Sequence, residues 1–166
     1  MAPRYDIPKL APEPLRRVQL FVNTADLGHG SDWLREWLEE QRLEGEHDRA
    51  LELREALRAL VVANNDGRKP APDALEVVNR GFARLVLGLD GEQRLRVRPG
   101  GDALEGVLAV TANAMLDGSW QRLKACRTCR WCFYDYSPNR SARWCSMRIC
   151  GNRRKTRAYR RRRGSP

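Results

Sequence analysis

Five cysteines lie close together near the end of the chain, between residues 126 and 150, and none occurs before them. Four of them are spaced as Cys126-x2-Cys129-x15-Cys145-x4-Cys150. Two closely spaced pairs separated by roughly 15–20 residues are typical of a structural zinc site. Four thiolates complete the tetrahedral shell of one ion and leave no open position for catalysis. The spacing therefore predicts that these four cysteines bind Zn²⁺.

The residues between the two pairs predict how the site is built. Aromatic residues follow Cys129, and the run 137–140, Ser-Pro-Asn-Arg, favours a hairpin-like turn. Cys145 and Ser146 are then expected to open a helix that carries Cys150 in its first turns. This order of knuckle, hairpin and helix is that of a treble-clef finger.

Two other interpretations of the cysteines remain open. Cys126, Cys129 and Cys132 also open a bacterial iron–sulfur motif, but that motif next requires a cysteine where Tyr136 stands. Reduced thiols without any metal are the other alternative. Zinc is favoured over both, and Cys132 is then interpreted as a packing residue or a free thiol.

The sequence gives no sign of export or of membrane insertion. No apolar run approaches the roughly 18–20 residues of a membrane span, and the first residues lack the pattern of a secretory signal. Clustered cysteines in a chain that is not exported are more often metal ligands than disulfides. We therefore expect a cytoplasmic, nucleoid-associated protein with no membrane partner.

The charge is distributed very unevenly along the 166 residues, whose formal net charge is +10. Residues 122–166 contain 15 Lys and Arg against a single acid, a net charge of +14, whereas residues 1–121 carry −4. Such a division indicates a polyanionic partner, most often nucleic acid.

The segment after Cys150 predicts a basic helix. It has no apolar stripe with which to pack on a core or insert into a membrane surface. A solvated charge run is the alternative, but a metal site at the start of the helix would hold it at a fixed angle, which favours binding to double-stranded DNA. Its arginines would pair with phosphates and release counterions, and one or two could read guanine edges. The candidate contacts are Arg140, Arg143, Arg148, Asn152, Arg153, Arg154, Lys155, Arg157, Arg160 and Arg161.

Before the cysteines, the pattern predicts a mostly α body with one β-hairpin. Residues 1–14 contain several prolines and are expected to form a flexible leader, and residues 15–121 to form the body. In the helix expected at 46–63, Arg54 and Arg58 are placed on the exposed face. Helices are expected at 14–23, 31–45, 46–63, 72–79 and 102–116, and strands at 82–89 and 93–98 around Asp90-Gly91.

Nothing in the sequence indicates an enzyme. His29 and His47 have no partner at ligand spacing and are interpreted as surface residues. No nucleophile with a matching base and no phosphate-binding loop is visible. Asn23 and Thr24 are candidate pocket residues, although the end of a helix explains them more simply.

The tetrapeptide Cys150-Gly151-Asn152-Arg153, with Trp144-Cys145-Ser146 before it, resembles the CGNR zinc-finger family. The upstream residues 131–141 fit the same pattern. Looser traces in the body resemble the ABATE domain that precedes this finger in bacterial stress-responsive transcription regulators. These traces are Phe21-Val22-Asn23-Thr24, Asp32-x-Leu34-x-x-Trp37-Leu38, the helix around 51–57 and Leu123-Lys124-Ala125.

This resemblance implies an ABATE-like domain over 15–121 and a CGNR-type zinc finger with a basic C-terminal helix over 122–166. It also implies that Cys126, Cys129, Cys145 and Cys150 are the zinc ligands. The function implied is that of a sequence-specific DNA-binding transcription regulator, with a sensory N-terminal domain and a small-molecule effector. Docking on RNA polymerase and binding of structured RNA remain the alternatives.

Overall fold

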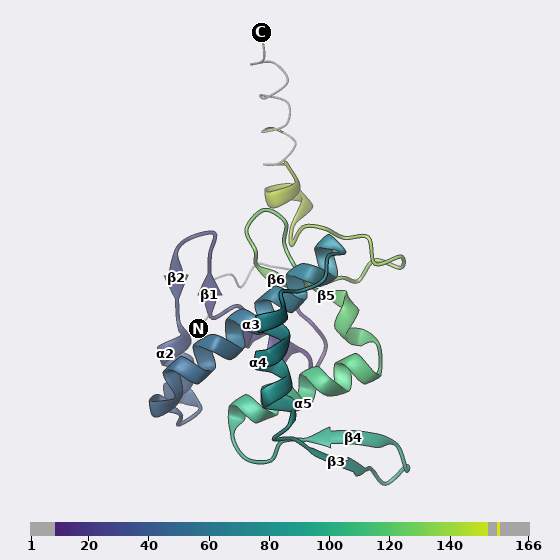
Figure 1. Cartoon of the computed structure of the whole chain (residues 1–166). Coiled ribbons are helices and arrows are strands. Elements are labelled where there is room, and N and C mark those ends of the chain that lie inside the picture. The colour runs from purple at the N-terminus through teal and green to yellow at the C-terminus, as the bar shows by residue number, and fades with distance from the viewer. Residues whose placement is uncertain (1–8, 153–155, 157–166) are drawn as a thin grey trace.

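The longest helix, α3 (His47–Asp66), runs through the centre of the molecule (Figure 1). The structure is a computed structural model that describes residues 9–152 and 156. The helix ends at Gly67, whose φ of 68° is left-handed, as helix-terminating glycines commonly are. The sequence predicted an end at Ala63, but the helix continues through Asn64 and Asn65, whose side chains donate to backbone carbonyls between residues 120 and 143.

Shorter helices surround α3, as predicted for a mostly α body. Pro72 is the first residue of its helix, and the Asp102 carboxylate caps another by accepting from the Glu105 N–H at 2.9 Å. The α-helices are α1 (Arg16–Val22), α2 (Leu34–Glu40), α4 (Pro72–Phe82) and α5 (Ala103–Leu116). The shorter turns are the 3₁₀ helices η1 (Glu44–Glu46) and η2 (Ser119–Arg122) and the π-helical turn η3 (Met147–Gly151).

The strands form three antiparallel pairs among the described residues. They are β1 (Ala25–Asp26) with β2 (Ser31–Asp32), β3 (Val86–Leu89) with β4 (Leu95–Arg98), and β5 (Leu123–Ala125) with β6 (Cys132–Tyr134). The predicted hairpin is β3–β4, but its first strand begins at Val86 rather than at residue 82, and Leu89 pairs with Leu95, so the connection spans residues 90–94 rather than 90–92. Asp90 closes it by accepting from the backbone of Glu92 and Arg94. Residues 25–30, expected to be a loop, contribute one strand of β1–β2.

Two arginines of α3 are buried, contrary to the prediction that they face solvent. The exposed fractions of Arg54 and Arg58 are 3% and 5%. Arg54 holds Asp32 through two nitrogens at 2.7 and 2.8 Å, and Arg58 donates to the Val22 carbonyl at 2.6 Å. The helical period alone did not reveal this, because the β1–β2 hairpin and the end of α1 cover that face and supply the acceptors.

The strands β5 and β6 belong to the same hydrophobic core as the helices. Leu123, Ala125, Cys132 and Tyr134 are buried together with core residues of α1, α3 and α5. Residues 9–14 of the expected flexible leader are also held in place, since the Lys9 carbonyl accepts from the Tyr134 N–H at 2.9 Å and Ala11 is fully buried. The metal-binding region is therefore built onto the body.

No helix in the described part of the chain is both long and apolar enough to cross a membrane. The β3–β4 hairpin and the cysteine-rich region lie at opposite ends of the molecule (Figure 1).

Candidate metal centre

The first pair of cysteines lies on the tight connection between β5 and β6. The Cys126 N–H donates to the Trp131 carbonyl at 2.8 Å, and the Arg130 N–H donates to the Cys126 carbonyl at 2.9 Å. Arg130 adopts a left-handed φ of 61°, which allows the chain to turn back on itself. The Thr128 N–H points at the Cys126 sulfur, 3.5 Å away. This knuckle brings Cys126 and Cys129 to one point.

The second pair lies on either side of a helical start. Ser146 begins η3, where its hydroxyl accepts from the Ile149 N–H at 3.3 Å and its carbonyl from the Cys150 N–H at 3.0 Å. The Thr128 hydroxyl donates to the Cys150 carbonyl at 3.3 Å and so connects the knuckle to the helical turn. The expected turn at 137–140 is present, but residues 135–144 contain no strand.

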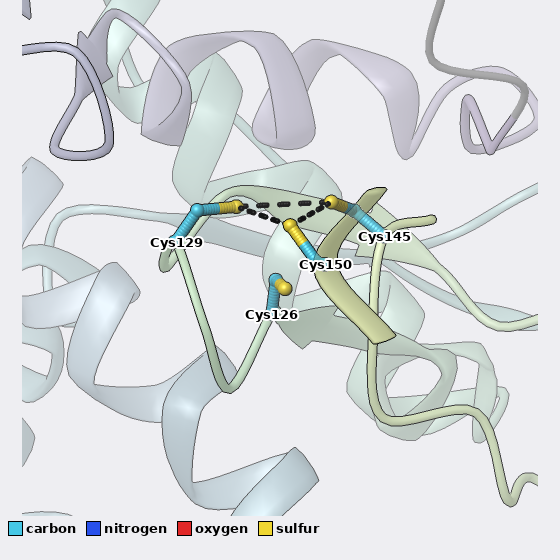
Figure 2. A group of neighbouring side chains, drawn as sticks. All are labelled: Cys126, Cys129, Cys145 and Cys150. Carbon is cyan, nitrogen blue, oxygen red and sulfur yellow. Dashed lines mark hydrogen bonds between the residues drawn. The ribbon is translucent and has the colours of Figure 1, made fainter. Parts of the chain in front are cut away.

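The four sulfur atoms form a small cage. The Sγ atoms of Cys129, Cys145 and Cys150 are 3.7 Å from one another, and Cys126 Sγ lies within 4.8 Å of all three (Figure 2). Thiolates about 2.3 Å from a tetrahedral zinc ion would be about 3.8 Å apart. A disulfide would need about 2.05 Å. All four side chains are buried, so the cage has the size and the donor set for one tetrahedral metal ion.

Two family models match the sequence. The CGNR zinc finger matches residues 122–163, and ABATE, described as "Putative stress-induced transcription regulator", matches residues 15–118, more than half of the chain. The chain belongs to the ABATE family. No curated protein matches it. The two families are those of a transcription regulator and a zinc finger, and neither is described as an enzyme.

Two residues of the tetrapeptide that identifies the finger of this ABATE-family chain have a clear structural role. Cys150 contributes to the cage, and Gly151 is buried where an added Cβ would lie 3.0 Å from the Met147 sulfur. Asn152 is exposed and continues the helical turn. The fourth residue, Arg153, lies outside the described residues.

Because four thiols lie in one cage, their interactions shift the pKa values of Cys126, Cys145 and Cys150. Hydrogen bonds from Cys129 and Cys145 lower the pKa of Cys126 far below its usual range. Hydrogen bonding to Cys126 raises the pKa of Cys145, and burial together with the neighbouring thiols raises the pKa of Cys150. Four thiolates cannot share this volume without a cation, which is why a divalent metal suits the site.

A buried ion pair organises the loop between the two cysteine pairs. Asp135 is fully buried and its carboxylate accepts from Lys124 Nζ at 2.8 Å. It also accepts from the Ser137 hydroxyl at 2.6 Å and from the Ala142 N–H at 3.0 Å. Although burial opposes it, these bonds hold the pKa of Asp135 below its usual value. No role was predicted for this pair, but a lone acid in a strongly basic segment was a signal that could have found it.

The predicted nucleic-acid contacts fall into two groups. Arg140, Arg143, Arg148 and Asn152 are all exposed around the finger. Arg140 also donates to the Gln121 side chain. The others, Arg153, Arg154, Lys155, Arg157, Arg160 and Arg161, lie outside the described residues. Thr156, which is described among them, is helical and exposed.

The fifth cysteine connects the finger to the body. Cys132 is fully buried in the main core, and burial raises the pKa of its thiol. Its backbone N–H donates to the Asn23 side chain at 2.8 Å, and its carbonyl accepts from Asn23 at 2.9 Å and from Gln19 at 3.1 Å. Cys132 was predicted to be a packing residue or a free thiol, and it is a packing residue of the core whose thiol forms no disulfide. Asn23 lies at the C-terminal end of α1, as predicted by the simpler of the two explanations, and its side chain also bonds to β6.

Proposed function

We propose that this chain is a sequence-specific DNA-binding transcription regulator whose finger is held together by Zn²⁺. The observation that supports this most is that the cage lies directly before the basic segment, residues 153–163. Cys150 lies in the cage, Asn152 follows it in the same helical turn, and the arginines begin at the next residue. A metal bound there would fix the direction in which the basic segment leaves the protein.

Zinc fits the site better than an iron–sulfur cluster. Sulfur atoms 3.7 Å apart enclose room for a single ion, whereas a cluster needs a wider cage. The extra cysteine of the iron–sulfur motif, Cys132, is buried in the main core and bonded to Asn23 through its backbone. The site is closed and has no histidine or carboxylate among its donors, which favours a structural rather than a catalytic metal.

DNA would be bound first through its backbone. Each arginine that pairs with a phosphate releases a counterion, so the logarithm of the affinity should fall with the logarithm of the salt concentration by about 0.9 per contact. The exposed Arg143 and Arg148 flank the cage and extend the basic surface beyond the segment that follows Cys150. Such a protein would act in the cytoplasm, on the chromosome.

The experiment that tests the proposal is selection of bound duplexes from a random pool, followed by affinity measurements over a range of salt. We expect an enriched sequence, one zinc ion per chain by mass spectrometry, and loss of both zinc and DNA binding in Cys150→Ser. Cys132→Ala is the matched control and should keep both. A Cys150→Ser protein that binds duplex as tightly as the wild type would contradict the proposal.

Adding RNA polymerase or structured RNA to the same assay separates the two alternatives. If binding required polymerase, the polymerase would be the primary partner instead of DNA. If the protein bound RNA more tightly than duplex DNA at equal salt, RNA would be the primary partner. If the purified protein were brown or red, the bound metal would be iron rather than zinc.

A sensory role for the N-terminal domain belongs to the same proposal. A hollow of about 440 Å³ lies between α3, α4 and α5, with an apolar floor that includes Leu53, Val77 and Leu108. Its rim holds Arg80, paired with Glu52 at 2.6 Å. A partly apolar hollow with charged groups at its rim suits a small amphipathic effector. A compound that binds there should raise the unfolding temperature of the wild type and shift its affinity for the selected duplex.

A further inference from the structure

A second hollow, of about 360 Å³, lies where the C-terminal end of α3 meets the knuckle of the finger. All four residues that line it are charged: Asp66, Arg68, Arg127 and Arg130. They come from the last residue of α3, the loop that follows it and the knuckle, so tertiary structure brings them together. An apolar ligand would find almost no matching surface here.

Among the described residues, Arg127 is the one of the three arginines whose side chain donates a hydrogen bond, although its Nε has no hydrogen-bond partner there. The Arg127 guanidinium lies 3.0 Å from the Asp66 carboxylate and donates to the Asn65 carbonyl at 2.7 Å. Arg130 approaches Asp66 only to 3.7 Å, beyond hydrogen-bonding distance. Arg68 is exposed and bonds to none of the residues that the structure describes. One carboxylate thus faces three guanidinium groups.

This excess of positive charge points to an anion. Guanidinium groups that converge on one hollow repel each other, and an anion between them removes that repulsion. Their planar forks match the oxygens of a phosphate particularly well. Arg127, held by Asp66 and Asn65, is already in place, while the side chains of Arg68 and Arg130 donate no hydrogen bond to any residue that the structure describes. We propose that this hollow binds a phosphate group.

The position of the hollow favours a phosphate of the DNA backbone as the source. Arg127 and Arg130 each follow a cage cysteine directly, so the metal that would fix Cys150 also fixes them. The knuckle and η3 lie at the same end of the molecule (Figure 1). A duplex held by the basic segment would have a second, rigid contact here. The assignment of the phosphate to DNA rests on the proposed function, whereas the phosphate site itself does not.

The test uses the full-length zinc-loaded protein and the double variant Arg68→Gln/Arg130→Gln. Both residues are exposed, and neither side chain donates a hydrogen bond to a described residue, unlike Arg127. Arg35→Gln, an exposed arginine of α2 at a distance from the finger, is the matched control. With the selected duplex, we expect the double variant to bind about tenfold more weakly and its salt slope to fall by about 1, while the control is unchanged.

A second arm titrates inorganic pyrophosphate and follows both ³¹P line width and the unfolding temperature. Loss of pyrophosphate binding in the double variant with unchanged DNA binding would keep the phosphate site and assign it to a free phosphorylated ligand. If the wild type bound no duplex at all, the pyrophosphate titration would still show whether the hollow binds phosphate. A double variant equal to the wild type in both arms would overturn the inference, and Arg68→Gln alone repeats the test if the double variant is unfolded.

Discussion

At the scale of single residues, the Asp135 carboxylate bonds to both ends of the loop between the two cysteine pairs. It is the only acid between residues 122 and 166, and it joins β5, through Lys124, to the loop that leads to Cys145. Lys124 is itself only 5% exposed and donates onward to the Arg140 and Ala142 carbonyls. A single carboxylate therefore connects the strand before Cys126 with the loop before Cys145.

Replacing Asp135 by Asn should destabilise the protein by about 3–5 kcal/mol, because it leaves the buried Lys124 without its counter-charge. Urea unfolding of the zinc-loaded protein measures this. Asp48→Asn removes an acid whose side chain is fully exposed and serves as the control, which should change little. A loss below about 1 kcal/mol would mean that water replaces the pair without penalty.

The contribution of Asp135 should also depend on pH in a defined direction. Because its pKa is lowered in the folded protein, its stabilisation is present above the usual value of about 3.9 and is lost as the pH falls through the lower folded value. The difference in free energy of unfolding between the wild type and Asp135→Asn should therefore be constant near neutral pH and shrink below about pH 4. A difference that grew in acid would contradict this.

At the scale of elements, two asparagine-containing helix ends hold the finger's strands. Asn23, at the end of α1, binds both backbone groups of Cys132, and Asn65, near the end of α3, donates to the Ala125 carbonyl at 2.6 Å. Both strands that flank the knuckle are thus bonded through their backbones to helices of the body. The orientation of the knuckle follows from these helix ends.

Asn23→Ala should cost about 1–3 kcal/mol, because the buried N–H of Cys132 loses its acceptor. The carbonyl of Cys132 keeps its bond from Gln19. Hydrogen exchange should show faster opening of β6 before any change in α4. Asn79→Ala, an exposed change on α4, is the matched control. Equal protection of β6 in both variants would contradict this role.

Removal of the metal should affect the knuckle and η3 but spare the elements packed in the core. We expect a chelator to make four of the five thiols reactive toward a disulfide reagent and to leave Cys132, which is fully buried in the main core, unreactive. Far-UV circular dichroism should show that most of the helix remains. Reaction of all five thiols would mean that the body unfolds with the finger.

At the scale of the whole molecule, the finger and the body share one core. Leu123, Ala125 and Tyr134 lie within the region matched by the zinc-finger family, yet they are buried with the helices of the ABATE domain. The cage forms a second, smaller cluster with Trp131 and Phe133. The boundary between the family matches therefore does not divide the structure into independent parts.

A chain truncated after residue 121 should lose much of its cooperative unfolding, because it lacks β5 and β6 and exposes the core that they cover. A chain truncated after residue 136 keeps both strands and should unfold cooperatively. Urea denaturation followed by circular dichroism compares them. Equal stability of the two fragments would show that the helices form a complete domain by themselves.

The sequence predicted the helices and the cysteine cage well because these depend on short-range patterns. Helical periods, Pro72 at a helix start and the two cysteine pairs each involve residues close in the chain. The β1–β2 strands, the burial of Arg54 and Arg58, and the contacts of Asn23 were not predicted. The two arginines and Asn23 depend on partners or covering elements far away in the sequence, whereas the β1–β2 strands are only two residues each and too short to show an alternating pattern.

The sequence by itself determined the main helices, the β3–β4 hairpin, the four cysteines of the cage and the separation of charge along the chain. Only the tertiary structure decided that the finger is joined to the body, since its strands bury their side chains against distant helices and satisfy their backbone groups there. It also decided which charges meet. Arg68 and Arg127 are 59 positions apart in the chain and line one hollow, because α3 ends where the knuckle turns.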